Sequence, residues 1–208
     1  MIRRPPRSTQ SRSSAASDVY KRQMENIALF YGSETGVTDD ITRDFVSLWE
    51  QDTLDLMEIA DATVIDFNKY EKLIFALSTW YDGDLQSDWE DFFDDFKTID
   101  FTNKTVAIFG LGDQVAYAEY FVDGIGILAK EVLKNGGKMI GYWPTKGYQH
   151  TESVAMLEEN SELFYGLPID EDNESQLTDE RLVSWISQIK KEFQSSCFEI
   201  LSLFERSK

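Results

Sequence analysis

One strand, loop and helix near the start of the chain constrain the fold more than any other stretch. An apolar run at residues 26–31 is followed by a loop at 32–38 and then by apolar residues at helical spacing over 39–49. Apart from Glu34 and Val37, the loop consists of glycines and small hydroxyl residues. The pattern predicts a buried strand that leads through a tight turn into an amphipathic helix.

The loop has the composition of a phosphate-binding site. Its backbone amides can approach a ligand closely, its Ser and Thr hydroxyls can donate to one, and the dipole of the next helix adds attraction. It lacks both the Lys of nucleotide-hydrolysing loops and the third glycine of dinucleotide-binding loops. We therefore expect neutral groups to hold a phosphate monoester. The alternative is an ordinary helix capped by Thr38 or a neighbour.

Length and charge restrict the class of protein. The 208 residues suffice for one domain, and the absence of an apolar run of transmembrane length predicts a soluble protein. The chain carries a formal charge of -18 and its first 23 residues carry +5, which leaves -23 for residues 24–208. Such a field repels nucleic acid and anionic membranes and favours basic protein partners.

The chain is poor in redox and metal ligands. Its single cysteine, Cys197, cannot hold an iron–sulfur cluster or form a dithiol couple. Its single histidine, His150, cannot build a zinc or haem-type site by itself. Any redox chemistry is therefore expected to reside in an organic cofactor.

The two ends differ in composition from the middle of the chain. Residues 1–23 are rich in Arg and Ser, as in an organelle transit peptide, but they also look like translated linker sequence, with Met24 as a natural start. We favour a non-native leader, and hence a cytoplasmic protein, or one of the plastid stroma if the leader is genuine. The domain is expected at 24–193. The tail, 194–208, could extend the last helix, contact a partner or be read-through.

Strands and helices alternate along the rest of the chain. Further strands are expected at 53–58, 72–78, 105–109 and 138–143, and further helices at 87–96, 121–132 and 178–193. Residues 144–162 lack a sustained period and are interpreted as an insertion in the last strand, after which an apolar run resumes at 163–167. The alternation predicts an α/β fold with a parallel sheet covered on both faces.

Three loops are expected to meet at the carboxyl edge of this sheet, where such folds bind ligands. They are 32–38, 78–86 and 110–120. The first is expected to bind the phosphate. The second carries Trp80, and the third carries Tyr117. Aromatic rings at loop tips suit a slot for a planar ring system.

These residues resemble those of a flavodoxin of the long-chain type, over about Met24 to Phe193. The resemblance rests on the segments at 29–36, 85–90, 109–114, 141–145, 170–173 and 177–181. It implies a flavodoxin-like three-layer sandwich whose five-stranded parallel sheet has the order 2-1-3-4-5, with an insertion in the last strand. It also implies non-covalently bound FMN and transfer of single electrons at low potential between a reductase and an acceptor.

The resemblance further implies which residues hold the cofactor. The phosphate would lie at residues 33–38, and Trp80 and Tyr117 would cover the two faces of the flavin. The full cofactor-binding set is Ser33, Glu34, Thr35, Gly36, Val37, Thr38, Ser78, Thr79, Trp80, Tyr81, Asp82, Gly83, Leu111, Gly112, Asp113, Tyr117 and Asp172.

Three residues depart from the family pattern. Glu34 brings a carboxylate into the phosphate loop, so its side chain is expected to point to water. Val37 replaces a polar or basic residue common there, and Tyr81 replaces a small polar one.

Acidic residues are concentrated in the loops of the same edge. Seven acids lie between Asp82 and Asp95. The other acids in loops expected at this edge are Asp113, Glu119, Asp123, Asp170, Glu171 and Asp172. A carboxylate ~10 Å from the ring, at an effective dielectric of ~20, opposes an added charge by about 1.7 kcal/mol. That corresponds to about 70 mV for one electron. The cluster predicts a low potential and a docking face for basic redox proteins, such as a ferredoxin/flavodoxin-NADP reductase, on a monomeric carrier.

Two alternatives were weighed against an electron carrier. An FMN-dependent NAD(P)H:quinone oxidoreductase on the same fold would need a second nucleotide-binding surface, which an acidic face disfavours. A phosphate-receiving signalling domain would need acids after the first strand and an Asp after the third, and residues 31–33 and 78–80 offer neither. No side chains are grouped as acid, base or nucleophile, so we expect a carrier and not an enzyme.

Overall fold

The computed structural model describes residues 27–49 and 54–206, with side chains described as far as Ser195. Its centre is a sheet in which five parallel strands follow the order β2-β1-β3-β5-β6. Their bounds are Ile27–Tyr31 (β1), Leu54–Glu58 (β2), Lys72–Trp80 (β3), Thr105–Leu111 (β5) and Lys138–Ile140 (β6). The expected order of five strands is therefore confirmed.

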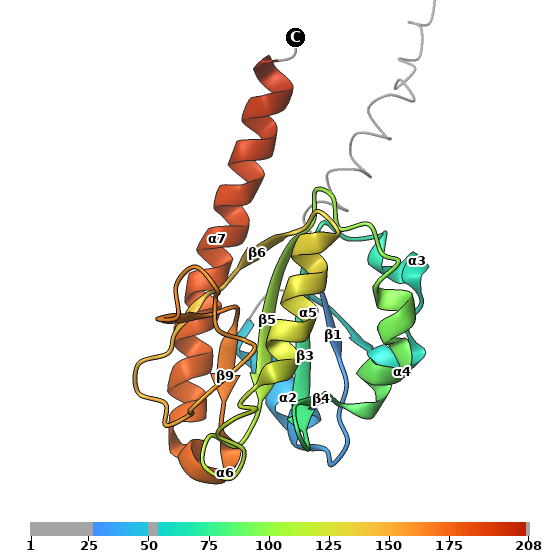
Figure 1. Ribbon diagram of the computed structural model, residues 1–208. Coiled ribbons are helices and arrows are strands. Elements are labelled where there is room, and N and C mark those ends of the chain that lie inside the picture. Colours follow the sequence, from blue (N-terminus) through green and yellow to red (C-terminus); the bar gives the residue numbers. More distant parts are fainter. Residues whose placement is uncertain (1–26, 50–53, 207–208) are drawn as a thin grey trace, which may run out of the picture.

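Helices cover both faces of the sheet, which confirms the three-layer arrangement (Figure 1). One face carries α2 (Val37–Trp49) and α7 (Thr178–Arg206), and the other carries α4 (Ser87–Phe96) and α5 (Asp123–Lys134). The shorter elements are η1 (Ile59–Asp61), α3 (Val64–Phe67), α6 (Glu171–Glu174) and η2 (Ser175–Leu177). Among the described residues, no helix is both long and apolar enough to cross a membrane.

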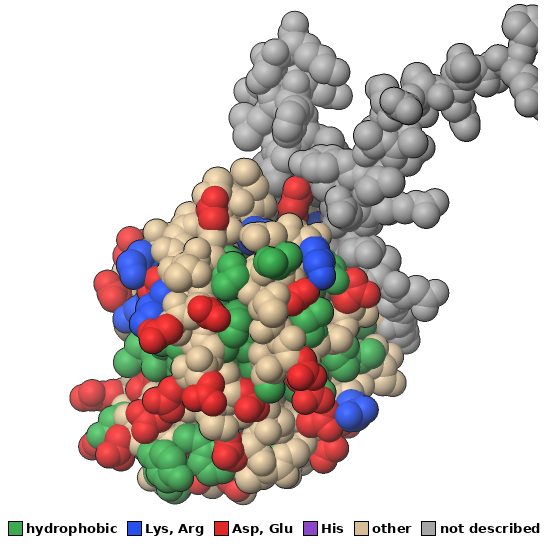
Figure 2. Space-filling view, turned by 90° about the vertical axis from the view of Figure 1, so that its right-hand side faces the viewer, with side chains coloured by type: hydrophobic (Ala, Val, Ile, Leu, Met, Phe, Trp, Pro, Cys, Tyr) green, Lys and Arg blue, Asp and Glu red, His purple; other side chains and the backbone are tan. Residues whose placement is uncertain are grey.

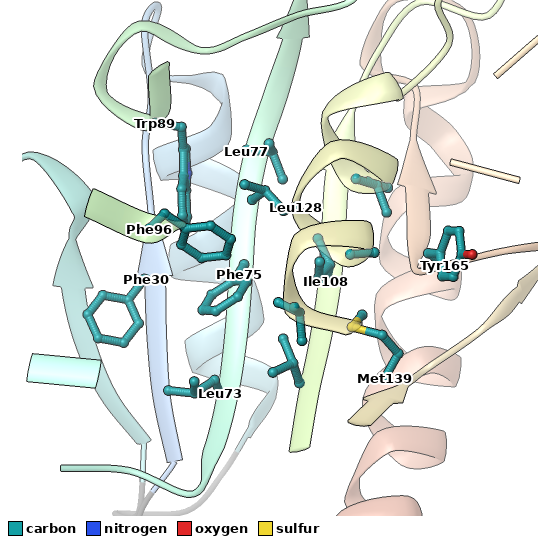
Figure 3. Close-up of a cluster of buried hydrophobic side chains, with 14 of the residues drawn as sticks. Phe30, Leu73, Phe75, Leu77, Trp89, Phe96, Ile108, Leu128, Met139 and Tyr165 are labelled. Atoms are coloured by element: carbon teal, nitrogen blue, oxygen red, sulfur yellow. The ribbon is translucent and has the colours of Figure 1, made fainter. Parts of the chain in front are cut away.

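The core on the α4 and α5 face combines aromatic rings with aliphatic side chains (Figure 3). Phe30 of β1 stacks on Phe67 of α3 with ring centroids 4.1 Å apart, and Phe75 of β3 meets Trp89 of α4 edge-on at 5.4 Å. The Trp89 ring is fully buried, and its Nε1 donates a 3.0 Å hydrogen bond to the carbonyl of Ala76. This bond fixes the start of α4 against the middle strand of the sheet.

The opposite core joins α2 and α7 to the sheet. Phe45 of α2 stacks on Phe109 of β5 with centroids 5.5 Å apart, and both rings are buried against Trp185 of α7. The buried residues of α7 continue to Phe193, as its helical spacing predicts. The helix itself does not end there but runs to Arg206, past the sheet edge opposite α6 (Figure 1).

The fifth strand breaks earlier than the sequence predicts. We expected it to reach Trp143, but β6 ends at Ile140, and Gly141 takes a left-handed conformation with φ +77°. A Cβ at Gly141 would lie 2.8 Å from Nε1 of Trp185, so the chain turns at the only residue type that fits. Trp143 instead lies in β7 (Trp143–Pro144), which pairs antiparallel with β8 (Leu163–Phe164).

The expected insertion in the last strand is confirmed. After β8 the chain returns to the sheet as β9 (Leu167–Ile169), which pairs parallel with β5 beyond the end of β6. The apolar run at 163–167 is thus shared between the small hairpin and the resumed strand.

Other expected boundaries were also wrong. The loop at 78–86 contains the end of β3 and a short strand, β4 (Asp84–Leu85), that folds back antiparallel on it. The helix expected from Phe121 begins at Asp123, because Val122 has φ +51° and cannot lie within a right-handed helix. The leader at 1–23 and residues Asn26 and Thr53 of two expected strands lie outside the described residues.

Candidate functional site

The three loops expected at the carboxyl edge of the sheet do meet there and line one pocket of about 460 Å³. The segment that follows β9 closes it. The lining residues are Thr35, Val37, Thr38, Ser78, Thr79, Trp80, Tyr81, Leu111, Gly112, Asp113, Tyr117, Glu171 and Asp172. A volume of this order is typical of small-molecule and cofactor sites.

Most of the residues expected to bind the cofactor line this pocket, but five do not: Ser33, Glu34, Gly36, Asp82 and Gly83. Ser33 and Gly36 face a smaller hollow of about 230 Å³ on the other side of the loop. Gly83 approaches α5 instead, since a Cβ there would lie 2.8 Å from Oδ2 of Asp123.

Glu171 was expected among the acids of this edge but not among the cofactor-binding residues, and it lines the pocket. The signal that could have found it is its position beside Asp172, at the start of the short helix α6.

The phosphate-loop candidate is ordered by its own serine. Ser33 Oγ accepts hydrogen bonds from the backbone N–H groups of Gly36, at 3.1 Å, and Asp39, at 3.3 Å. The expected cap of α2 is therefore supplied by Ser33 rather than Thr38. The hydroxyl residues of this loop that line the pocket are Thr35 and Thr38.

Glu34 is turned away from the pocket. Its side chain is exposed, as expected, but it is also fixed, because Ser87 Oγ donates a 2.6 Å hydrogen bond to Glu34 Oε2. Gln86 Nε2 lies 3.5 Å from the same oxygen. The carboxylate therefore lies at the start of α4, where a helix favours negative charge.

The other end of the pocket is aromatic and open. Trp80 is half-buried, and its Nε1 donates a 2.9 Å hydrogen bond to Ser78 Oγ, which fixes the indole. Tyr117 is 50% exposed and Tyr81 is 70% exposed. Tyr81 also adopts φ +44°, a conformation that costs a non-glycine residue about 1–2 kcal/mol.

Backbone contacts hold the aromatic loops in place. Thr79 Oγ1 accepts a 3.0 Å hydrogen bond from the N–H of Gly124 at the start of α5. Asp113 Oδ1 accepts bonds of 2.8 Å each from the N–H groups of Val115 and Ala116 and from Asn173 Nδ2. Burial alone would raise the pKa of Asp113, but these bonds hold it below its usual value. Asp113 therefore stays ionised beside the pocket.

A buried carboxylate that was expected among the acids of this edge, but not among the cofactor-binding residues, joins two of the loops. Asp170 is fully buried, and its oxygens accept hydrogen bonds from the N–H groups of Gln114, at 3.1 Å, and Asn173, at 2.9 Å. Asp123, expected among the acids of this edge, is also buried, and burial raises its pKa.

The surface near this edge is strongly acidic. Figure 2 shows Asp and Glu side chains gathered over the lower part of the face that carries α3 and α4, with few basic side chains among them. Among the described residues, no group of three or more His, Cys, Asp or Glu is arranged to hold a metal ion. The chemistry that this edge offers is binding of a phosphate and a flat ring within a negative field.

Comparisons with known proteins agree with this geometry. A family model described as Flavodoxin matches residues 29–185. A flavodoxin from Synechocystis is 46% identical over 83% of this chain and 100% of its own length. Flavodoxin 1 from Escherichia coli is 40% identical over 79% of this chain and 92% of its own length.

A solved structure is also similar. The flavodoxin of Fusobacterium nucleatum, whose crystal structure is bound to flavin mononucleotide, superposes with a TM-score of 0.77 at 33% identity, covering 82% of this chain and 99% of that one. These relatives favour an electron carrier over the two alternatives weighed above. With the family model matching most of the chain, the protein belongs to the flavodoxin family.

Proposed function

We propose that this protein is a low-potential one-electron carrier that binds FMN without a covalent bond. The observation that carries the proposal is a single pocket with a hydroxyl-rich, amide-rich loop at one end and two aromatic side chains from separate loops at the other. A phosphate monoester joined to a planar ring has the same two-ended chemistry.

The residues present fit FMN. Thr35, Thr38 and the amides of their loop would hold the phosphate, and Trp80 and Tyr117 would hold the ring. Ser33, Gly36, Asp82 and Gly83 would then act through the shape of the loops, because they do not line the pocket. When bound, FMN supplies the electron-transfer chemistry, and the protein supplies binding and electrostatics.

The acidic residues set the direction of the electrostatic effect. Asp113 is held ionised by its three hydrogen bonds, and Glu171 and Asp172 line the same pocket. Fixed negative charges oppose each electron added to a nearby group, so they favour a low reduction potential. The same charges favour encounter with basic partners.

We further propose that the physiological partners are basic redox proteins, such as a ferredoxin/flavodoxin-NADP reductase, and acceptor enzymes. The support is the formal charge of -23 on residues 24–208 together with the acidic face near the pocket. We propose that the protein is a monomer. We also propose that it works in the cytoplasm, or in the plastid stroma if residues 1–23 are a transit peptide.

The test is an absorption spectrum of the purified protein, followed by titration of the flavin-free protein with FMN and a potentiometric titration of the complex. The proposal expects a yellow protein, quenched FMN fluorescence and two low reduction potentials. A colourless protein that leaves the fluorescence of added FMN unchanged would contradict the proposed function.

A further inference from the structure

Glu34 places a negative charge in the loop that the proposed function assigns to a phosphate, and its contacts show how the chain accommodates that charge. The carboxylate does not face the pocket but the first turn of α4, where Ser87 Oγ donates the 2.6 Å bond to Glu34 Oε2. A negative charge is favourable at the amino end of a helix. The charge is thus stabilised on the side of the loop away from the phosphate position.

Gln86, one of the two groups that hold Glu34, is held in a fixed orientation by contacts of its own. Gln86 is fully buried, and its Oε1 accepts a 3.3 Å hydrogen bond from the N–H of Trp89, which makes Gln86 the N-cap of α4. Its Nε2 also donates a 2.7 Å bond to Asp88 Oδ2. The amide therefore has one fixed orientation, with its N–H groups directed at the two carboxylates.

The loop is fixed to the same structure at a second point. The N–H of Gly32 donates a 3.2 Å bond to the carbonyl of Ala76, which also accepts the 3.0 Å bond from Trp89 Nε1. A Cβ at Gly32 would lie 2.1 Å from Oε1 of Gln86, so the backbone approaches α4 as closely as it can. Gly32 and Glu34 thus anchor the first half of the loop to β3 and α4.

We infer that Glu34 is a positioning residue for the phosphate end of the pocket. Its carboxylate, held by Ser87 and Gln86, fixes the base of the loop from which Thr35 and Thr38 reach the pocket. The inference rests on the proposed function. It requires that Glu34 matter for a flavin that has a phosphate and not for one that lacks it.

The experiment titrates the flavin-free protein with FMN and, separately, with riboflavin, which has the same ring but no phosphate. In Glu34→Ala the Kd for FMN should rise roughly tenfold, because a hydrogen bond to a charged group is lost, while the Kd for riboflavin stays within about twofold. Ser87→Ala should act in the same direction. Glu34→Ala combined with Ser87→Ala should raise the Kd for FMN no further than Glu34→Ala alone, because Glu34→Ala already removes the contact with Ser87.

Two further variants distinguish the loss of the hydrogen bond between Ser87 and Glu34 from the loss of a negative charge. Glu90→Ala removes a carboxylate from the exposed side of the same helix and should leave both Kd values unchanged. Glu34→Gln keeps an oxygen acceptor for Ser87 and should bind FMN at least as tightly as Glu34→Ala.

The inference is overturned if Glu34→Ala leaves the FMN Kd unchanged, weakens both flavins equally, or is matched by Glu90→Ala. Should Glu34→Ala fail to fold, Ser87→Ala, a change at an exposed serine, carries the same test. If the unmodified protein binds neither flavin, the proposed function itself fails, which is a distinct result.

Discussion

The two ends of the pocket are built in opposite ways. At the phosphate end, Glu34 accepts hydrogen bonds from Ser87 and from the buried amide of Gln86. The N–H of Gly32 donates to the carbonyl of Ala76, which also accepts a bond from the buried indole of Trp89. At the ring end, Tyr81 and Tyr117 are 70% and 50% exposed, and Tyr81 adopts the strained φ of +44°. Hydrogen bonds hold the loops at both ends, but the first half of the phosphate loop packs against buried side chains of α4, whereas the ring end presents aromatic surface to solvent.

This difference follows from what each end has to do. A phosphate is held best by groups that are already in place, because ordering a loop on binding costs free energy. An electron must leave through the edge of the ring, so a partner protein has to approach that end. We therefore expect the anchored end to determine the affinity for the cofactor and the open end to determine how partner proteins dock. Each expectation can be tested separately.

The largest effect is expected from Gly32→Ala at the anchored end. The new Cβ would lie 2.1 Å from Gln86 Oε1 and 2.8 Å from Cδ1 of Trp89, and both side chains are fully buried. Overpacking of this kind typically lowers the free energy of unfolding by about 1–3 kcal/mol, and here it also displaces the phosphate loop. Urea unfolding of the flavin-free protein measures the first effect, and an FMN titration measures the second.

Gly147→Ala is the matched control for that change. Gly147 has φ +106° but no atom within 4 Å of its added Cβ, so the substitution adds backbone strain without a clash. It should cost about 1 kcal/mol and leave FMN affinity unchanged. If Gly32→Ala costs no more than the control, tight packing does not define the anchored end.

A smaller effect is expected from Tyr117→Ala at the open end. Loss of an aromatic face of the ring slot should raise the Kd for FMN roughly tenfold, and it should raise the Kd for riboflavin equally, because the ring is common to both. The second reduction potential should rise as well, since an electron-rich ring no longer disfavours added charge. Fluorescence titrations and a potentiometric titration measure these changes.

Val115→Ala, at a residue 57% exposed in the same loop and outside the pocket lining, is the control for Tyr117→Ala. It should alter neither affinity. A Tyr117→Ala protein with the affinities and potentials of the unmodified one would remove Tyr117 from the site.

The sequence predicts the sheet and the pocket well because both depend on local patterns. Buried apolar runs identify β1, β3 and β5 as strands of a parallel sheet, which brings the loops after them to one edge, whereas the strand order was implied by the family resemblance. Trp80 and Tyr117 could be identified because aromatic residues in loops at such an edge are uncommon without a role.

What the sequence could not predict depends on partners far away in the chain. The break at Gly141 is imposed by Trp185, whose Nε1 donates to the Gly141 carbonyl from 44 residues further on. Likewise, Glu34 appears from its own surroundings to point to water, and only the fold brings Ser87, 53 residues away, to its carboxylate. The fold-back of β4 on β3 was missed because a two-residue strand has no detectable period.

A smaller effect is expected from ionic strength, which should change the rate of reaction with a partner that docks at the open end. If partners dock at the open end, the rate of reduction by a basic reductase should fall severalfold as salt rises from about 0.1 to 1 M, where the screening length drops from about 10 to 3 Å. Asp82→Asn, beside the exposed aromatic rings, should reduce this salt dependence. Asp100→Asn, which removes the same charge just before β5 at the opposite edge, should not. A rate that is flat in salt would contradict electrostatic docking.

The smallest effect is expected from acid pH, which should weaken binding at the open end of the pocket only. His150, in the insertion, packs against both Phe121 and Phe164, with ring centroids 5.8 and 5.1 Å away. Burial lowers the pKa of His150, so the unfolded chain takes up the proton first as the pH falls below about 6.5. The folded state therefore loses stability through that range, and the loss levels off below the folded pKa.

The insertion transmits this loss to the aromatic loop, because the N–H groups of Thr151 and Glu152 donate bonds of 2.8 and 3.1 Å to the carbonyl of Ala118, next to Tyr117. Riboflavin, which contacts the ring end alone, should thus bind more weakly at about pH 5.5 than at pH 7.5. In His150→Phe, which keeps an aromatic ring of similar shape but cannot take up a proton, this part of the pH dependence of unfolding and of riboflavin binding should disappear. Equal pH dependence in both proteins would show that the insertion does not couple to the open end through His150.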